Sequence, residues 1–338
     1  MSREWLARIL IISLVVAALA VPAWGWWQRS QGVLIHGRMA ETGGWSPENL
    51  TAEVGKPLKL RLTSDDVMHG FAVGQMAMQP VDMLPGEISE IVLNFERPGK
   101  YVFYCSRWCS VNHWRMRGTI EVSGAAQAMP DDAEPPLYVQ LGLDIDEEHH
   151  ADVLPERMPS AAQGKALLAS LPDNAIPTIY LGPDTYYTNS PQQLWQALRA
   201  EQGLSALSDQ EVWDVVAAIW ESNTTPQALA EGQAMYSANC AACHGEGGAG
   251  DGVFAAQLTE HPSDHEEMQA DQMSQPPTDF TDPEHLLAAS PAHLQGKIIR
   301  GGMGTGMPYW GPIFTEEQTW NLVAYLWKFQ FNYEETEL

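Results

Sequence analysis

The chain has few basic residues. It contains 18 Lys and Arg against 43 Asp and Glu, which gives a formal net charge of -25 over 338 residues. Almost all of this excess lies in residues 124–338, with six basic and 32 acidic residues, whereas residues 33–123 hold nine and ten. Phosphates need a basic face, so the composition indicates that nucleic acid is not a partner. A basic redox partner would be attracted, although acidity also keeps an exported domain soluble.

Long hydrophobic runs are also scarce. The one that could span a bilayer is ILIISLVVAALAVPAWGWW at residues 9–27, in which Ser13 is the single ordinary polar side chain. Arg3 and Arg8 precede it, which predicts a cytoplasmic N-terminus and an extracytoplasmic remainder. A cleaved signal peptide is the alternative, but the run is long and lacks a clear small-x-small cleavage site. We expect a retained single-pass anchor in the lipid of a prokaryotic inner (plasma) membrane.

Cysteine is rare as well, with four residues in two close pairs. The first pair ends a segment, residues 33–123, that reads as short apolar or alternating runs punctuated by Gly and Pro, which predicts a small antiparallel β-sandwich or barrel. Here Cys105, Cys109, His113 and Met116 form a C-x3-C-x3-H-x2-M motif, and His69 lies far upstream.

Two thiolates, two imidazoles and a thioether form a soft donor set, which suits copper better than an oxygen-seeking ion. Three alternatives compete with a copper pair bridged by the thiolates. A Cys105–Cys109 disulfide leaves His113 and Met116 without a role. A Cys2His2 zinc site gains nothing from the thioether, and a mononuclear blue-copper site leaves one cysteine spare.

The stretches DVMHGFAV and MLPGEISEIVLNFERPGKYVFYCSRWCSVNHWRMRGTIEV resemble the CuA domain of cytochrome c oxidase subunit II. The resemblance covers about residues 45–123 and implies a cupredoxin fold that holds two coppers. It implies bridging thiolates from Cys105 and Cys109, imidazoles from His69 and His113, a weak Met116 thioether and the main-chain carbonyl of Arg107. Many relatives place a magnesium-binding Glu at position 107, so no magnesium ligand is expected there. A single anchor helix is more similar to the B-branch heme-copper oxidases.

The second pair stands in CAACH, residues 240–244, which is the C-x-x-C-H attachment signature for one heme c. Cys240 and Cys243 would bind the heme covalently, and His244 would be the proximal iron ligand. A redox dithiol is the alternative, but no βαβ pattern surrounds the motif. The following GEGGAGDG resembles the glycine-rich turn of class I cytochromes c. Met307, before a proline as in that family's ligand loop, is preferred to Met303 as the second axial ligand.

An internal repeat precedes this segment. SPQQLWQAL at 190–198 matches SPAHLQGKI at 290–298, and LSDQEVWDVVAAIW at 207–220 matches FTEEQTWNLVAYLW at 314–327. Both longer copies begin with a helix-capping box, Ser208 with Glu211 and Thr315 with Gln318. The first copy lacks C-x-x-C-H, so we interpret it as a cytochrome c-like domain without heme. Two unrelated amphipathic helices are the alternative.

The expected class is therefore a multidomain chain, with an N-terminal transmembrane helix, an all-β cupredoxin domain and all-α cytochrome c-like domains. The expected boundaries are a 1–32 anchor, a 33–123 CuA domain, a 124–157 acidic linker, a 158–225 heme-less repeat, a 226–332 cytochrome c domain and a 333–338 acidic tail. Six further histidines are interpreted as solvated, namely His149, His150, His261, His265, His285 and His293.

This arrangement predicts subunit II of a heme-copper terminal oxidase. Electrons would pass from the heme c to CuA and on to subunit I, where oxygen is reduced, because this chain holds no candidate oxygen-reducing site. The donor would be a soluble or membrane cytochrome. Two alternatives stay open, a small subunit of a nitric oxide reductase and a membrane-anchored redox protein that serves no oxidase.

Overall fold

The structure is a computed structural model that describes residues 32–76, 78–110, 112–124, 134–172, 175–256, 276–302 and 307–333, with four single positions among the first 18. The predicted anchor run, residues 9–27, lies outside these ranges, as do Met303 and residues 334–338. Within the described ranges, no helix is both long enough and apolar enough to cross a membrane. The described residues form two compact units. The first comprises those of Met1–Ala72, Gln79–Cys105 and Arg115–Asp131, and the second those of Val73–Met78, Ser106–Trp114 and Asp132–Leu338.

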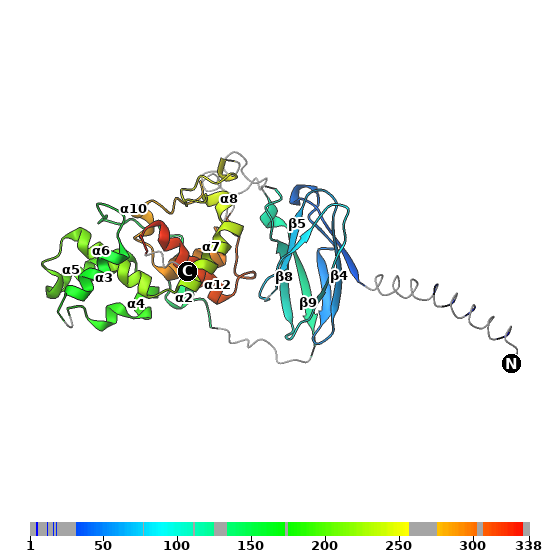
Figure 1. Ribbon diagram of the computed structural model, residues 1–338, viewed down its shortest axis with the longest axis horizontal. Helices are drawn as coiled ribbons and strands as arrows, with labels where there is room; N and C mark the ends of the chain where they lie inside the picture. Colours follow the sequence, from blue (N-terminus) through cyan, green and yellow to red (C-terminus); the bar gives the residue numbers. More distant parts are fainter. Residues whose placement is uncertain are drawn as a thin grey trace. The chain divides into compact units, whose positions relative to one another are not determined.

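The β-structure is a sandwich of two sheets (Figure 1). One sheet has the strand order β2-β1-β4-β7 and the other the order β3-β9-β8-β5-β6. The strands are β1 Val33–Gly37, β2 Trp45–Ser46, β3 Asn49–Glu53, β4 Leu58–Ser64, β5 His69–Val73, β6 Val81–Met83, β7 Ser89–Leu93, β8 Gly99–Cys105 and β9 Arg117–Ser123. The sandwich was predicted, but the purely antiparallel pairing was wrong, because β1 runs parallel to β4 and β3 parallel to β9.

The core of the sandwich follows from the alternation of side chains along each strand. In β4, Leu60 and Leu62 are buried while Lys59 is exposed, because successive side chains point to opposite faces of a sheet. The rings of Phe71 and Phe103 stack with centroids 5.4 Å apart, and Trp45 meets both edge-on. This aromatic cluster fixes the ends of β5 and β8, the two strands that carry predicted copper ligands.

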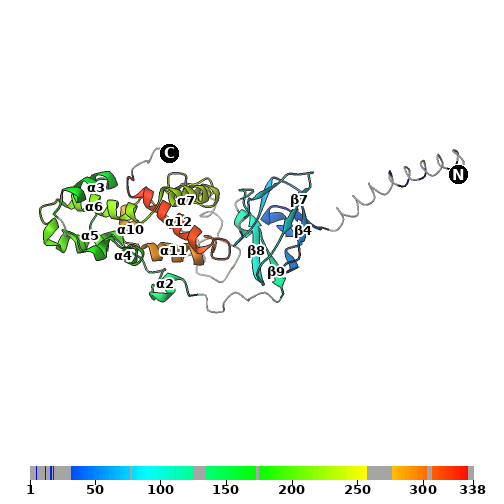
Figure 2. The ribbon, with the colours of Figure 1, turned by 60° about the horizontal axis from the view of Figure 1, so that its bottom comes forward.

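The second unit is helical (Figure 2). Its longer helices are α3 Ala161–Ser170, α5 Pro191–Ala200, α6 Asp209–Ser222, α7 Pro226–Asn239, α11 Pro291–Arg300 and α12 Glu316–Leu326. Its shorter elements are α2 Leu137–Gln140, η3 Thr178–Leu181, α4 Pro183–Thr188, η4 Gln202–Leu204, α8 Ala241–His244, α10 Pro283–Leu286 and η5 Trp327–Phe329. Both predicted capping boxes are present, Ser208 with Glu211 before α6 and Thr315 with Gln318 before α12.

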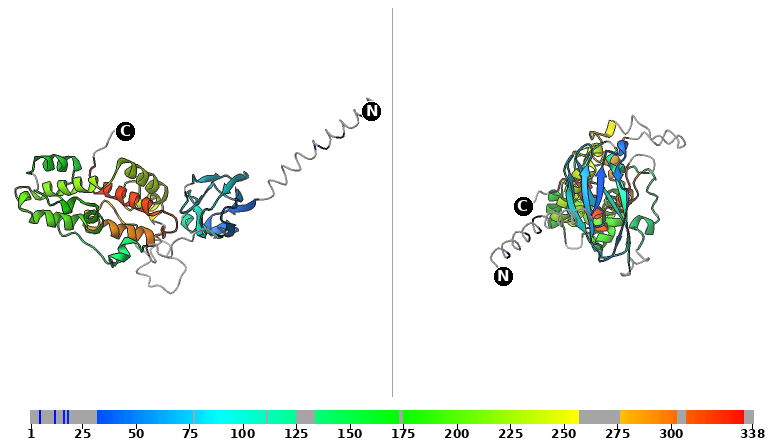
Figure 3. Two further views of the ribbon diagram at one scale, coloured as in Figure 1. Left: turned by 90° about the horizontal axis from the view of Figure 1, so that it is seen from below. Right: turned by 90° about the vertical axis from the view of Figure 1, so that its right-hand side faces the viewer.

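The helices pair in a way that matches the repeat. α3 packs against α6 and α7 packs against α12 (Figures 2 and 3). Each pair meets at a glycine. A Cβ at Gly164 would lie 1.9 Å from the Asp214 carbonyl oxygen, and one at Gly232 would lie 2.1 Å from that of Asn321. Asp214 and Asn321 occupy equivalent positions in the two matched sequences, so both copies use the same glycine-mediated helix contact. That the first copy is a heme-less cytochrome c domain stays a prediction.

Candidate copper and heme sites

The five side chains predicted to bind copper come from the ends of two strands and the loop between β8 and β9. His69 begins β5, Cys105 ends β8, and His113 begins a short 3-10 helix, η2 His113–Arg115. Met116 follows directly, and its carbonyl accepts a hydrogen bond of 3.1 Å from the Cys105 amide. This bond closes the base of the loop that carries Cys109 and His113.

Three of the five residues lie together. The ligand atoms of His69, Cys105 and Cys109 are all within 4.8 Å of one another. The Cys105 Sγ is 3.9 Å from His69 Nδ1, and both side chains are buried. No disulfide bond joins Cys105 and Cys109, which disagrees with the disulfide alternative. Two thiols and an imidazole this close could hold a soft metal ion.

Asp66 fixes the orientation of His69. The carboxylate accepts a 2.7 Å hydrogen bond from His69 Nε2, which leaves Nδ1 facing the Cys105 sulfur. Burial works against the carboxylate charge, but the N–H groups of Met39 and Val67 and the His69 ring lower the pKa of Asp66 below its ordinary value. For His69, burial lowers the pKa, but the Cys105 thiol and Asp66 outweigh it and raise the pKa.

His113 is the fourth predicted ligand, and it is outside the three-residue cluster. Its ring is 2% exposed, and neither ring nitrogen has a hydrogen-bond partner among the described residues. A buried imidazole with two unsatisfied nitrogens is costly unless a ligand binds one of them. The Trp108 ring packs on it with centroids 4.0 Å apart. Together with Met116, which is 1% exposed, these groups fit a copper site.

The predicted heme-attachment motif forms a single turn, α8, that follows α7 directly. His244 Nδ1 lies 3.0 Å from the Thr278 carbonyl oxygen, so the neutral ring donates there and keeps Nε2 available for a metal. The Phe280 ring stacks on His244 at 4.6 Å. Burial lowers the pKa of His244, which keeps the imidazole neutral, although its bond to Thr278 works in the opposite sense.

The two cysteines of this motif do not have the properties of a reactive dithiol. Burial raises the pKa of Cys240 to about 12, with a further contribution from Cys243, and raises that of Cys243 to about 11. Redox-active C-x-x-C pairs need a lowered thiol pKa. These protonated, half-buried thiols therefore favour covalent heme attachment over the redox alternative.

The predicted glycine-rich turn and methionine loop are described in part. Gly248 and Gly250 have φ angles of 79° and 72°, which is the left-handed region that favours glycine. The Gly250 amide donates to the His244 carbonyl at 2.9 Å, so the turn holds the end of the motif. The Met307 carbonyl accepts a bond from Gly302 at 3.2 Å. Binding of iron by its side chain remains a prediction.

Both motifs lie within segments that match known families. Residues 46–123 match the periplasmic domain of cytochrome c oxidase subunit II, and residues 229–330 match cytochrome c. One chain joins a subunit II domain to a cytochrome c domain. The subunit II domain contains the five predicted copper ligands and Arg107, which is exposed, and the cytochrome c domain contains all of C-x-x-C-H and Met307.

The relatives are similar over the subunit II domain. Two curated subunit 2 proteins of Thermus thermophilus are 38% identical over 79 residues, which are 23% of this chain and 58% and 46% of theirs. The chain thus spans about half the length of these relatives. A solved subunit II periplasmic domain of Bradyrhizobium japonicum is 26% identical over 23% of this chain and 55% of that one, with a TM-score of 0.22.

Sequence reasoning missed four residues around these sites. They are Asp66, Trp108, Thr278 and Phe280. The first two lie within three positions of a predicted ligand in sequence, and the others are 34 or more residues from His244. An acidic residue three positions before His69 was the one available signal. The interpretation of His293 as solvated was wrong. It is 7% exposed and pairs with His149, with His149 Nε2 3.1 Å from its Nδ1.

Proposed function

We propose that the chain is subunit II of a heme-copper terminal oxidase and that it relays electrons from its own heme c, through a dinuclear CuA centre, to subunit I. The observation that carries the proposal is the cluster of His69 and Cys105, which are buried, and Cys109, which is half-buried, on the same chain as C-x-x-C-H. Copper and heme bound at these residues would each accept and release one electron at a time. Oxygen reduction would belong to the partner subunit.

The chain's own residues hold the relay groups rigidly. The Asp66 bond and the packed rings of Trp45, Phe71 and Phe103 keep His69 and Cys105 from moving. Thr278 and Phe280 do the same for His244. Ligands held in fixed positions move little when the charge on a metal changes, and that favours fast electron transfer.

We further propose that His113 and Met116 complete the copper site, with the Arg107 carbonyl, and that Met307 is the second axial ligand of the heme. The unsatisfied nitrogens of His113 support its part of this assignment. The predicted anchor, residues 9–27, would hold the domains at the outer face of a prokaryotic membrane beside subunit I.

Metal and heme analysis of the complex purified from its native membrane tests the proposal. We expect about two coppers and one covalent heme per chain, a seven-line copper hyperfine pattern, and a many-helix partner carrying heme. Cys109→Ser should abolish the seven-line pattern and leave the heme spectrum unchanged. One copper per chain, zinc in its place, or a chain that purifies without a large partner would contradict the proposal.

A further inference from the structure

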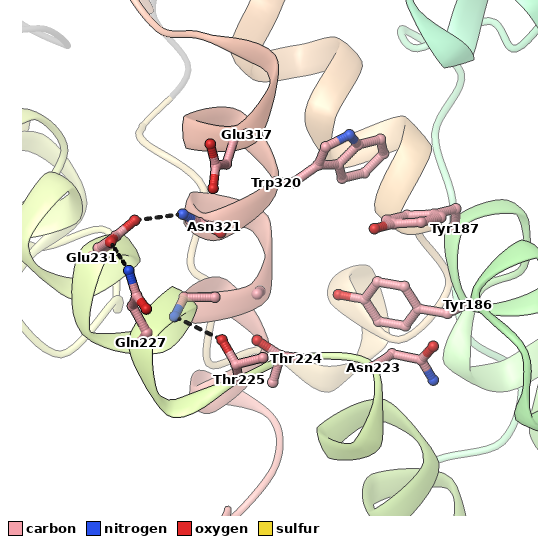
Figure 4. A pocket seen from close by; sticks show the side chains of 12 residues that line it. Tyr186, Tyr187, Asn223, Thr224, Thr225, Gln227, Glu231, Glu317, Trp320 and Asn321 are labelled. Atoms are coloured by element: carbon pink, nitrogen blue, oxygen red, sulfur yellow. Dashed lines mark hydrogen bonds between the residues drawn. The ribbon is translucent and has the colours of Figure 1, made fainter. Parts of the chain in front are cut away.

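A cavity of about 290 Å³ lies in the helical unit, between the first copy of the repeat and the heme-bearing copy. It opens to solvent and is lined by α4, the end of α6, α7 and α12. Figure 4 shows Tyr186, Tyr187 and Trp320 along one side and Glu231, Glu317 and Asn321 along the other. None of these residues belongs to the predicted copper or heme ligands.

The aromatic side is held together by its own ring contacts. Tyr187 and Trp320 lie 4.4 Å apart and Tyr186 and Tyr187 lie 5.1 Å apart, measured between ring centroids. Tyr186 is 4% exposed and also packs against Trp220. The π-faces of aromatic rings attract cations. Because these rings are already held in place, ligand binding costs little side-chain entropy.

The opposite side is acidic. Glu231 accepts hydrogen bonds of 2.8 Å from Gln227 and from Asn321. These neutral donors orient the carboxylate without neutralising its charge. Glu317 has no ion pair in the part of the chain that the structure describes. The described lining of the cavity contains no Lys, Arg or His. An anion would therefore be repelled, whereas a cation would meet carboxylates on one side and rings on the other.

A third observation points to a polar ligand. Thr224 lines the cavity, and its hydroxyl oxygen is buried and lacks a hydrogen-bond partner among the described residues. Buried polar atoms in folded proteins nearly always have a partner. A turn of the Thr224 side chain would let the hydroxyl group of a bound molecule satisfy it.

We propose that this cavity binds a small quaternary ammonium compound carrying a hydroxyl group. Its methylated nitrogen packs against Tyr186, Tyr187 and Trp320 and faces the two carboxylates. Its hydroxyl group bonds to Thr224. The cavity is near the lower end of the size range of small-molecule sites, which suits a compact cation.

Choline is the probe, and 3,3-dimethylbutan-1-ol is the control, because it has the same shape without the charge. Binding to the purified holoprotein is measured by saturation-transfer NMR and calorimetry. We expect choline to bind at least tenfold more tightly than the neutral isostere. Equal affinities would overturn the proposal, as would undetectable binding of choline or preferential binding of glucose as a neutral polar ligand.

Variants separate the site from general acidity. Glu317→Gln and Tyr187→Leu should each weaken choline binding at least threefold, while Tyr187→Phe keeps the ring and should bind within twofold of wild type. Glu156→Gln removes one exposed charge outside the cavity and should have no effect. An equal loss in Glu156→Gln would show attraction to the acidic surface as a whole and would overturn the assignment. The heme absorption spectrum checks that each variant is folded.

Discussion

Asp66 illustrates how a residue that binds no metal decides what its neighbour can bind. Its carboxylate accepts from His69 Nε2, so the nitrogen that remains for a metal is Nδ1, the one directed at Cys105. The neighbouring Asp65 instead pairs with His36 and Arg38 at the surface. The two adjacent aspartates thus have different partners, and each can be substituted without changing the contacts of the other.

Asp66→Asn should weaken copper binding roughly 10- to 100-fold, which is the usual effect of losing the partner of a metal-binding histidine. The amide can still contact the ring, but it no longer stabilises the tautomer with a proton on Nε2. Competition with a copper chelator measures the affinity, and Asp65→Asn is the matched control. The assignment fails if both variants bind copper equally well or if Asp66→Asn matches wild type.

His293 gives a pH-dependent contribution to stability. Burial is the main reason that its pKa is lowered to about 4. The nearby His149, Lys297 and Arg300 lower the pKa further, whereas Asp146 raises it. The unfolded chain, with an ordinary histidine pKa near 6.5, takes up this proton first as pH falls. The neutral His293 therefore makes its whole contribution to the free energy of unfolding above about pH 6.5. That contribution is lost as the pH falls towards 4, by about 3 kcal/mol at most.

Urea unfolding at pH 7 and pH 5, followed by helical circular dichroism, tests this contribution. Wild type should lose more stability over that interval than His293→Gln, which cannot titrate and can still bond to His149. His285→Gln changes an exposed histidine and should behave like wild type. If wild type and His293→Gln lose the same stability between these two pH values, protonation of His293 does not contribute.

At the scale of elements, local patterns were enough for much of the fold. Two kinds of feature involve residues only three or four positions apart, the capping boxes of α6 and α12 and the C-x-x-C-H turn. They can therefore be predicted from the sequence. Contacts between distant segments could not be predicted from local sequence. The parallel pairing of β1 with β4, the Thr278 bond to His244 and the burial of His293 all depend on tertiary packing. His69 was found by family resemblance, since its strand lies 36 residues from Cys105.

The glycine contacts between helices give an element-scale prediction. Gly232→Ala places a Cβ against the Asn321 carbonyl, so α7 and α12 must separate, at a cost of about 1–3 kcal/mol. Because α7 leads directly into the C-x-x-C-H turn, heme content should fall with the melting temperature. Absorption of the purified chain and its thermal unfolding measure both.

Gly164→Ala makes the equivalent change between α3 and α6, in the copy without C-x-x-C-H. It should lower the melting temperature by a similar amount and leave heme content close to wild type. Gly182→Ala, where the nearest atom is 3.8 Å away, is the control for both. Equal heme loss in Gly164→Ala and Gly232→Ala would show that the two copies do not fold as separate packing units.

For the whole molecule, charge distribution separates the two parts of the chain. Residues 33–123 are nearly neutral, whereas residues 124–338 carry a net charge of -26, and the predicted heme is in this acidic part. Electron exchange at the heme should therefore be fast with cationic partners and slow with anionic ones at low ionic strength. The subunit II domain has no such field of its own to direct a donor.

Two small redox reagents of opposite charge test this at the heme. Reoxidation of the reduced holoprotein by tris(phenanthroline)cobalt(III) should slow as salt rises from about 10 to 200 mM, because the Debye length falls from about 30 Å to below 10 Å. Reoxidation by ferricyanide should accelerate over the same range, since screening removes repulsion. Stopped-flow absorbance of the heme gives both rates. If the two reoxidation rates changed in the same direction as salt rises, the negative charge of residues 124–338 would not act at the heme edge.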